Sequence, residues 1–124
     1  MANSQQRLPT WCSGDGWCPM VATSAVLGRK WHPVILQRLL EHGPLRFGEL
    51  DARIQGVSGK VLSESLSDLQ EKGLVDRTVV TEQPVHVVYS LTPQGRGLED
   101  AVEELHRWGR EYLREAAAPE ESVI

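Results

Sequence analysis

Apolar residues recur every three or four positions through the first half of the chain, and β-branched residues dominate the region that follows. The helical spacing predicts a short first helix after Pro19 that ends near Gly28, a second over residues 30–43 and a third over residues 46–54. Pro19 suits the first turn of a helix, because its missing N–H would have no partner there. Gly43 and the proline after it are expected to end the second helix.

Residues 58–73 carry the clearest helix signal. Ser58 is a suitable N-cap, and Gly73 followed by a leucine suits a Schellman C-cap. A stripe of Leu62, Leu66 and Leu69 predicts the buried face. The opposite, polar face comprises Lys60, Ser63, Glu64 and Ser67.

Two β-branched runs, residues 74–81 and 85–92, predict a hairpin, and a long helix is expected to follow over residues 94–117. Three helices, a two-stranded hairpin and a further helix give an α+β, mainly helical fold of the winged helix-turn-helix type. In that fold the helix before the hairpin enters the DNA major groove and the hairpin is the wing. The stripe of the long helix, more apolar than such a small core needs, predicts a dimer interface, or a helix that folds back on its own domain; it comprises Leu98, Val102, Leu105, Trp108 and Tyr112.

The 124 residues are enough for one domain, which we expect over residues 18–117, with an irregular arm before it (1–17) and a frayed tail after it (118–124). No stretch resembles a signal peptide or a membrane span, so a cytoplasmic protein with no membrane partner is expected. The formal net charge of −4 argues against a general polycation. However, nine Lys/Arg balance nine Asp/Glu over residues 1–93, which leaves room for a local basic face.

Both cysteines, Cys12 and Cys18, lie near the start of the chain, separated by five residues that include two glycines. Cys18 directly precedes Pro19, at the predicted N-cap of the first helix, where amide dipoles favour the reactive thiolate form. An intrachain disulfide, with Cys12 as the resolving thiol, and an intersubunit disulfide are both candidates. Two thiols without a nearby histidine supply only half of a zinc shell, so no metal site is expected, and thiol catalysis lacks a recognisable base.

Several segments in their order and spacing closely resemble the HxlR-type winged-helix transcription regulators. The similarity extends over roughly residues 18–112 and is carried by Cys18-Pro19, GRKW (28–31), GPLRFGEL (43–50), VSGKVL (57–62), LQEKGLVDR (69–77) and YSLTPQG (89–95). The resemblance implies a homodimeric regulator that binds a double-stranded DNA operator, with dimer contacts from the N- and C-terminal helices. It also implies a cysteine at the position of Cys18 that responds to an oxidant, a quinone or an aldehyde.

The chain departs from the family pattern at three places. Ser65 and Ser67 replace residues that are commonly basic, and HVVY (86–89) stands where the second wing strand often reads RVEY. These changes remove positive charge, so only modest non-specific DNA affinity is expected. Cys12 has no counterpart in the pattern.

The predicted recognition helix and its flanks supply the candidate DNA contacts. Lys60 lies in the first turn, where the macrodipole disfavours a cation, which indicates either a phosphate or guanine contact or an ordinary solvated lysine. Glu64 could accept a hydrogen bond from cytosine or repel phosphate, and the polar face as a whole could simply be solvated. The helix candidates are Ser58, Gly59, Lys60, Ser63, Glu64 and Ser67.

Outside that helix, Arg46 and Arg77 are candidate phosphate clamps, although each has an acidic neighbour, Glu49 or Asp76, with which it could pair instead. Gln83 and His86 are expected near the wing tip, where they could approach the minor groove; His86 could also be an ordinary exposed histidine.

We therefore expect a homodimeric repressor whose operator affinity changes when Cys18 is oxidised or alkylated, with neither cofactor nor enzymatic activity. One alternative is control by a non-covalent apolar effector bound between the long helix and the core. Another is a winged helix that binds proteins and not DNA, for which the neutral serine-rich face is the best support.

Overall fold

The computed structural model describes residues 18–113, and the expected arm (1–17) and tail (118–124) lie outside this range. The first two helices are α2 (Pro19–Leu27) and α3 (His32–His42). Strand β1 (Leu45–Arg46) leads into α4 (Phe47–Arg53), and α5 (Gly59–Glu71) follows after a turn. The hairpin β2 (Val75–Val80) and β3 (His86–Leu91) precedes α6 (Pro93–Arg96) and α7 (Glu99–Tyr112).

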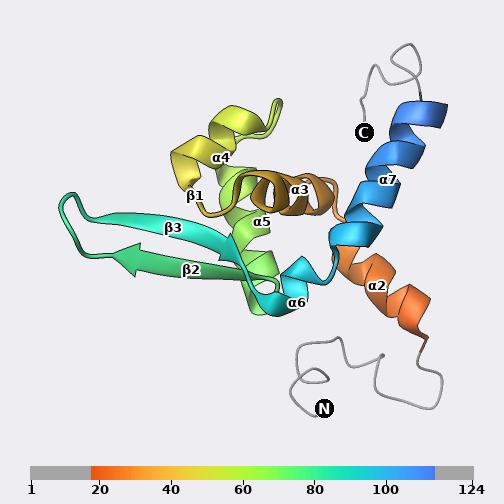
Figure 1. Ribbon diagram of the computed structural model, residues 1–124, viewed down its shortest axis with the longest axis horizontal. Helices are drawn as coiled ribbons and strands as arrows, with labels where there is room; N and C mark the ends of the chain where they lie inside the picture. Colours follow the sequence, from red (N-terminus) through yellow and green to blue (C-terminus); the bar gives the residue numbers. More distant parts are fainter. Residues whose placement is uncertain (1–17, 114–124) are drawn as a thin grey trace.

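The helices α3, α4 and α5 pack around one core, and the hairpin extends away from it at one end (Figure 1). The core is mainly aliphatic, and its fully buried side chains include Ile35, Leu36, Leu50, Leu62 and Leu66. Helices α2 and α7 lie at the end of the molecule opposite the hairpin tip (Figure 1). This arrangement is the winged helix that the order of elements predicted.

The sheet has three antiparallel strands in the order β1-β3-β2, one more than the predicted hairpin. Strand β1 pairs Leu45 with Tyr89 and Arg46 with Val88. The sequence pattern missed β1 because two residues are too few to show an alternation. Its consequence is that the start of α4 is tied to the base of the wing.

The single helix predicted over residues 94–117 is wrong near its start, because α6 ends at Arg96 and α7 begins at Glu99. Thr92 Oγ1 accepts from the Gly95 N–H at 3.0 Å and donates to the Gly73 carbonyl at 2.7 Å, which holds α6 against the end of α5. Gly97 and Leu98 then bond to carbonyls three residues back, at 3.2 and 3.1 Å, and this tightening ends α6. Helix α7 restarts at Glu99, with acidic residues in its first turn as the macrodipole favours.

Candidate nucleic-acid interface

Helix α5 is held by a cap at each end and by a buried leucine stripe. Ser58 Oγ accepts from the Val61 N–H at 3.1 Å, which confirms the predicted N-cap. Gly73 has φ 80°, and the Gly73 and Leu74 N–H groups bond to the Gln70 and Leu69 carbonyls, which is the predicted Schellman pattern. These contacts fix the rotation of α5 about its axis and so decide which side chains face outward.

The structure brings the predicted contact residues of α5 together on one exposed face. Lys60, Ser63, Glu64 and Ser67 follow helical spacing and are all exposed, and Ser58 and Gly59 are exposed at the N-terminus. Ser65, by contrast, is buried. Within residues 18–113, Lys60 has no carboxylate within 4 Å, so its charge stays available to a ligand.

The two candidate arginines outside α5 are exposed on the two outer strands of the sheet, β1 and β2. Arg46 ends β1, and its backbone N–H donates to Glu49 Oε1 at 2.8 Å, so this carboxylate caps α4. Arg77 lies on β2, opposite Tyr89 of β3. Neither the Arg46–Glu49 nor the Arg77–Asp76 ion pair is formed within 4 Å in the described part of the chain.

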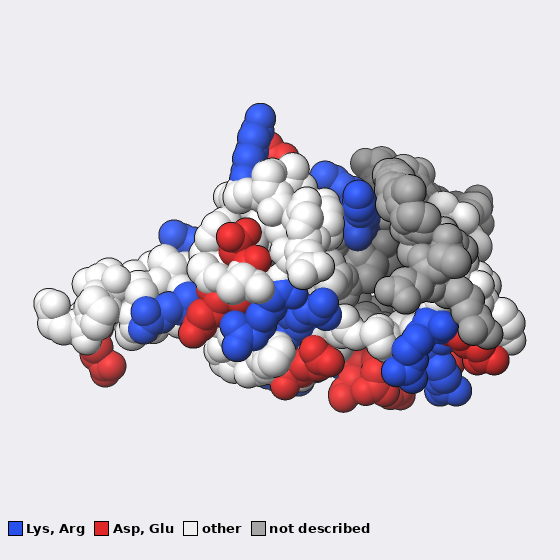
Figure 2. All heavy atoms as spheres, turned by 90° about the horizontal axis from the view of Figure 1, so that it is seen from above, with Lys and Arg blue, Asp and Glu red and all other residues white. Residues whose placement is uncertain are grey.

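The wing tip carries few charges. Gln83 is exposed, and half-buried His86 donates from Nδ1 to the Pro84 carbonyl at 2.7 Å, so its ring is held by the turn and is not a freely exposed histidine. Val79 and Val85 are exposed apolar side chains on the same hairpin. Figure 2 shows a mostly uncharged wing, with blue and red groups interleaved over the rest of that face and no continuous basic field.

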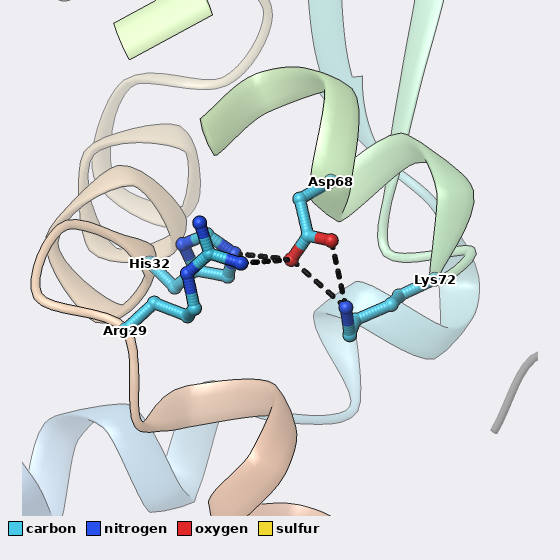
Figure 3. A network of polar contacts seen from close by, with 4 residues as sticks. All are labelled: Arg29, His32, Asp68 and Lys72. Atoms are coloured by element: carbon cyan, nitrogen blue, oxygen red, sulfur yellow. Dashed lines mark hydrogen bonds and ion pairs between the residues drawn. The ribbon is translucent and has the colours of Figure 1, made fainter. Parts of the chain in front are cut away.

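Sequence reasoning missed a polar cluster near the C-terminal end of α5, which joins that helix to α3 and to the α2–α3 connection (Figure 3). Its centre is Asp68, whose Oδ2 accepts from His32 Nε2 at 2.7 Å. Lys72 Nζ donates to both carboxylate oxygens, at 2.8 and 2.9 Å, and Arg29 lies 3.8 Å from Oδ2. The spacing of Asp68 and Lys72 was readable as an i, i+4 pair, but nothing in the sequence indicated His32, 36 residues away.

The charges in this Asp68 cluster are set by burial and by hydrogen bonds. Burial alone would raise the pKa of Asp68, but the bonds from Lys72 and His32 outweigh it and leave the pKa below its usual value. For His32, which is fully buried, desolvation outweighs the Asp68 bond and lowers the pKa. A neutral His32 that donates from Nε2 to a charged Asp68 fits both directions.

Cys18 is half-buried and is the N-cap of α2, as predicted, with Pro19 in the first turn. Its carbonyl accepts from the Ala22 N–H at 3.0 Å, which closes the first turn of the helix. Cys12 lies outside the described residues, so the structure does not relate the two thiols. Across residues 18–113 no group of three or more His, Cys, Asp or Glu is placed to hold a metal ion.

The apolar stripe of the C-terminal segment divides into two parts. Val102 is buried and Leu98 packs against the same core, so this part covers the chain's own domain. Leu105, Trp108 and Tyr112 are 52 to 61% exposed, and the last two rings lie 5.3 Å apart between centroids. Helix α2 exposes Met20 and Val21 at the same end of the molecule.

No helix among the described residues is long and apolar enough to cross a bilayer. The family model described as HxlR-like helix-turn-helix matches residues 26–117. The chain is 37% identical over 97 residues to the HTH-type transcriptional regulator YvaP of Bacillus subtilis, covering 77% of this chain and 89% of YvaP. It is 35% identical over 100 residues to the HTH-type transcriptional regulator YodB of the same organism, covering 80% and 88%.

Solved structures of similar regulators superpose on the fold. The reduced form of YodB from B. subtilis superposes with a TM-score of 0.69 at 35% identity, covering 78% of this chain and 95% of that one. The redox regulator HypR in its oxidised form superposes with a TM-score of 0.71 at 33% identity, covering 76% and 96%. The chain therefore belongs to the HxlR-like helix-turn-helix family of transcription regulators.

Proposed function

We propose that this chain acts as a homodimeric repressor that inserts α5 into the major groove of an operator and is controlled by the thiol of Cys18. The observation that carries the DNA-binding part is the exposed face of α5, where Lys60, Ser63, Glu64 and Ser67 project beside the wing. A rigid, capped helix of this kind suits base readout, because its side chains reach the groove without reordering the backbone.

The candidate residues differ in the DNA groups that they bind. Lys60 donates to a phosphate or to guanine O6 and N7, and the serine hydroxyls pair with either donors or acceptors on base edges. Glu64 accepts from cytosine N4 and repels phosphate elsewhere, which trades affinity for specificity. Arg46 and Arg77 each bind a phosphate of the DNA backbone. These contacts set the position of the protein along the operator without reading its sequence.

Dimerisation brings two such helices onto one operator. The exposed apolar side chains of α2 and α7 supply a self-complementary surface that a second copy would cover, with Trp108 and Tyr112 as aromatic anchors. A two-fold operator then has half-sites about 34 Å apart, one turn of DNA.

Cys18 supports thiol control because the side chain is partly accessible at a helix N-terminus, where amide dipoles favour thiolate. Diamide takes two electrons and two protons from a pair of thiols as a disulfide forms, the second thiol being Cys12 or a cysteine of the partner copy. A quinone instead takes the thiolate at a ring carbon and becomes a substituted hydroquinone after proton transfer. Among similar structures, YodB is known both reduced and diamide-treated, and HypR both oxidised and reduced.

The Asp68 cluster offers a route from Cys18 to the DNA. Modification at the start of α2 shifts that helix, and Arg29 lies in the connection that follows it, 3.8 Å from the Asp68 carboxylate of α5. A displacement of α2 therefore changes both the dimer surface and the support of the recognition helix. Either change alters how two recognition helices fit one operator.

The deciding experiment is a gel shift with DNA from upstream of the protein's own and neighbouring genes. Wild type, Cys18→Ser and Cys12→Ser are compared when reduced and after diamide. Reduced wild type and reduced Cys18→Ser should bind, and diamide should release only proteins that retain Cys18. Release of Cys18→Ser by diamide would refute the thiol switch, and the lack of salt-sensitive binding by any protein would refute the DNA-binding role.

A second mode of control is supported by an apolar hollow of about 350 Å³ between α2 and the α6–α7 segment. Its walls include Ala22, Val26, Leu27, Leu74 and Leu98. A non-covalent apolar effector held there would act on α2 without touching a thiol. Thermal stabilisation by such a compound, retained in a Cys12→Ser/Cys18→Ser variant, would favour this mode.

A further inference from the structure

A second hollow, of about 510 Å³, lies between the first half of α3 and the end of α4. We refer to it as the α3–α4 hollow. Three of its lining side chains are cations, Lys30, Arg38 and Arg53, and none of its lining residues is acidic. The remaining walls include the apolar side chains of Trp31, Val34 and Ile54.

The three cations are oriented by neutral groups. Arg38 Nε donates to the Arg53 carbonyl at 2.9 Å, and Arg53 NH1 donates to the Glu49 carbonyl at 3.1 Å. Lys30 Nζ lies 5.0 Å from the centroid of the Trp31 ring. Within the described chain none of the three has a carboxylate within 4 Å, so their positive charge is not balanced by an ion pair.

This arrangement is complementary to an anion. Arg38 NH1 also donates to Gln37 Oε1, at 2.5 Å. Each guanidinium has five N–H donors, so both arginines keep donors beyond those engaged in these bonds. Like charges held around one hollow repel one another, and an anion among them removes that repulsion and gains charge-assisted hydrogen bonds. Because both arginines are already oriented, less side-chain entropy is lost on binding.

The apolar wall defines the rest of the ligand. Trp31, Val34 and Ile54 offer no hydrogen-bond partner to a second polar group except the indole N–H, so they suit a hydrocarbon or ring body. A volume of about 510 Å³ lies within the range of small-molecule sites. A DNA phosphate would satisfy the cations but would leave this wall without a partner.

We propose that the α3–α4 hollow binds a small organic carboxylate, with the carboxylate held by Arg38 and Arg53 and its apolar body packed on Trp31. The ligand would lie against the turn that begins at residue 53 and ends at Ser58, the N-cap of α5. The Trp31 ring lies beside that turn, since a Cβ added at Gly56 (φ 90°) would be 3.6 Å from it. Ligand binding therefore acts on the position of α5; this regulatory consequence rests on the proposed DNA-binding function, whereas binding itself does not.

The binding test is calorimetric titration of the reduced full chain with benzoate, 2-naphthoate and octanoate, and with benzamide as a neutral counterpart. Arg38→Gln and Arg53→Gln remove one charge each from the hollow, and Arg96→Gln removes an exposed charge from α6 as the matched control. At least one carboxylate should bind, and each hollow variant should weaken it about tenfold, as expected for one lost charge-assisted hydrogen bond. Arg96→Gln should leave the affinity within about twofold, and benzamide should bind at least about tenfold more weakly than benzoate if benzoate binds.

The arginine variants could lose binding because they fail to fold, so Lys30→Gln serves as a further test. The exposed Lys30 side chain makes no hydrogen bond to the described residues, and its replacement should not affect folding. It should weaken carboxylate binding while the melting curve stays that of the wild type. If no carboxylate binds at millimolar concentration, or if Arg38→Gln, Arg53→Gln and Lys30→Gln all bind as tightly as Arg96→Gln, the proposal is wrong.

Measurements of operator binding distinguish a carboxylate site in the α3–α4 hollow from a set of cations that contact DNA phosphates. If the hollow variants lose operator affinity without any ligand, show a shallower salt dependence and bind no carboxylate, the cations contact phosphate and the proposal is wrong. The bound carboxylate should change operator affinity for wild type and not for Arg38→Gln. Arg38-dependent carboxylate binding by a chain that binds no operator would retain the site and remove only the DNA-binding function.

Discussion

His32 Nδ1 is buried and has no hydrogen-bond partner among the described residues. A neutral ring that donates from Nε2 to Asp68 leaves only a lone pair at Nδ1. Protonation would place an unpaired N–H there, which costs about 1 to 3 kcal/mol or more for a charged group. The position therefore tolerates the neutral ring and disfavours the imidazolium, although Asp68 lies 2.7 Å from the other nitrogen.

The lowered pKa of His32 predicts a stability that falls on acidification. Below about pH 6.5 the unfolded chain protonates this histidine, while the folded chain resists until its lower pKa is reached. The stabilisation that comes from neutral His32 is therefore fully present above about pH 6.5. It is lost as the pH falls from there through the lower pKa of the folded chain. Asp68, whose pKa lies below 3.8, adds a further loss at lower pH still.

Denaturant unfolding between pH 7.5 and 5 measures the effect. His32→Asn should flatten the pH dependence, and His42→Asn, at a partly exposed position on the same helix, should keep the wild-type slope. Equal slopes for His32→Asn and wild type would show that His32 does not resist protonation in the folded chain.

Lys60 carries a prediction about DNA. Lys60→Gln should weaken operator binding by about 1 to 3 kcal/mol if the ammonium contacts a base, with relaxed specificity at one position. If it contacts a phosphate, affinity should fall for all sequences and the salt slope should drop by about one. Fluorescence anisotropy at several salt concentrations distinguishes these results, and an unchanged affinity and slope would place Lys60 outside the interface.

The residues that sequence could place are those that depend on local spacing. Ser58, Lys60 and Leu62 follow from cap chemistry and the period of one helix, and the structure puts each where the pattern predicted. His32 and Asp68 could not be paired, because their contact depends on how α3 crosses α5, which no local period encodes.

At the scale of elements, the division between α6 and α7 depends on a close contact at Gly95. The apolar period alone indicated one helix. A Cβ at Gly95 would overlap the Leu74 carbonyl oxygen and lie 3.2 Å from the Leu91 side chain, so only glycine lets α6 approach the end of α5 so closely. That approach is tertiary, and therefore the sequence could not reveal where the helix breaks.

Gly95→Ala should therefore destabilise the fold by about 1 to 3 kcal/mol or more, because backbone must move to admit the methyl group. Gly48→Ala is the matched control within α4, where a Cβ meets nothing within 4 Å, and it should stabilise by up to about 1 kcal/mol. Urea denaturation of both variants provides the comparison. A neutral Gly95→Ala would show that α6 can withdraw from Leu74 at no cost.

At the scale of the whole molecule, the polar and apolar surfaces lie at different places. The face of α5 and the wing carry the candidate DNA contacts, while α2 and α7 expose Met20, Leu105, Trp108 and Tyr112 at the end opposite the wing tip. Sequence predicted one continuous stripe on the C-terminal helix, but the core of the domain covers Val102. Only the outer part of α7 is left for a partner.

That division predicts separate effects of substitutions along α7. Val102→Ala should lower stability by about 1 to 3 kcal/mol, since the methyl groups are lost from the core, without changing how the folded chain self-associates at micromolar concentration. Trp108→Glu should leave the fold of the single chain intact and weaken the dimer at least about tenfold, because a carboxylate would be buried in an apolar interface.

Sedimentation analysis measures the dimer, and Arg110→Glu, on the opposite side of the same helix, introduces the same residue as a control. Because one recognition helix holds only a half-site, Trp108→Glu should also lose operator affinity at concentrations where the wild type is dimeric. A Trp108→Glu protein that stays dimeric and binds operator like Arg110→Glu would move the interface away from α7. The exposed aromatic pair would then need a different partner.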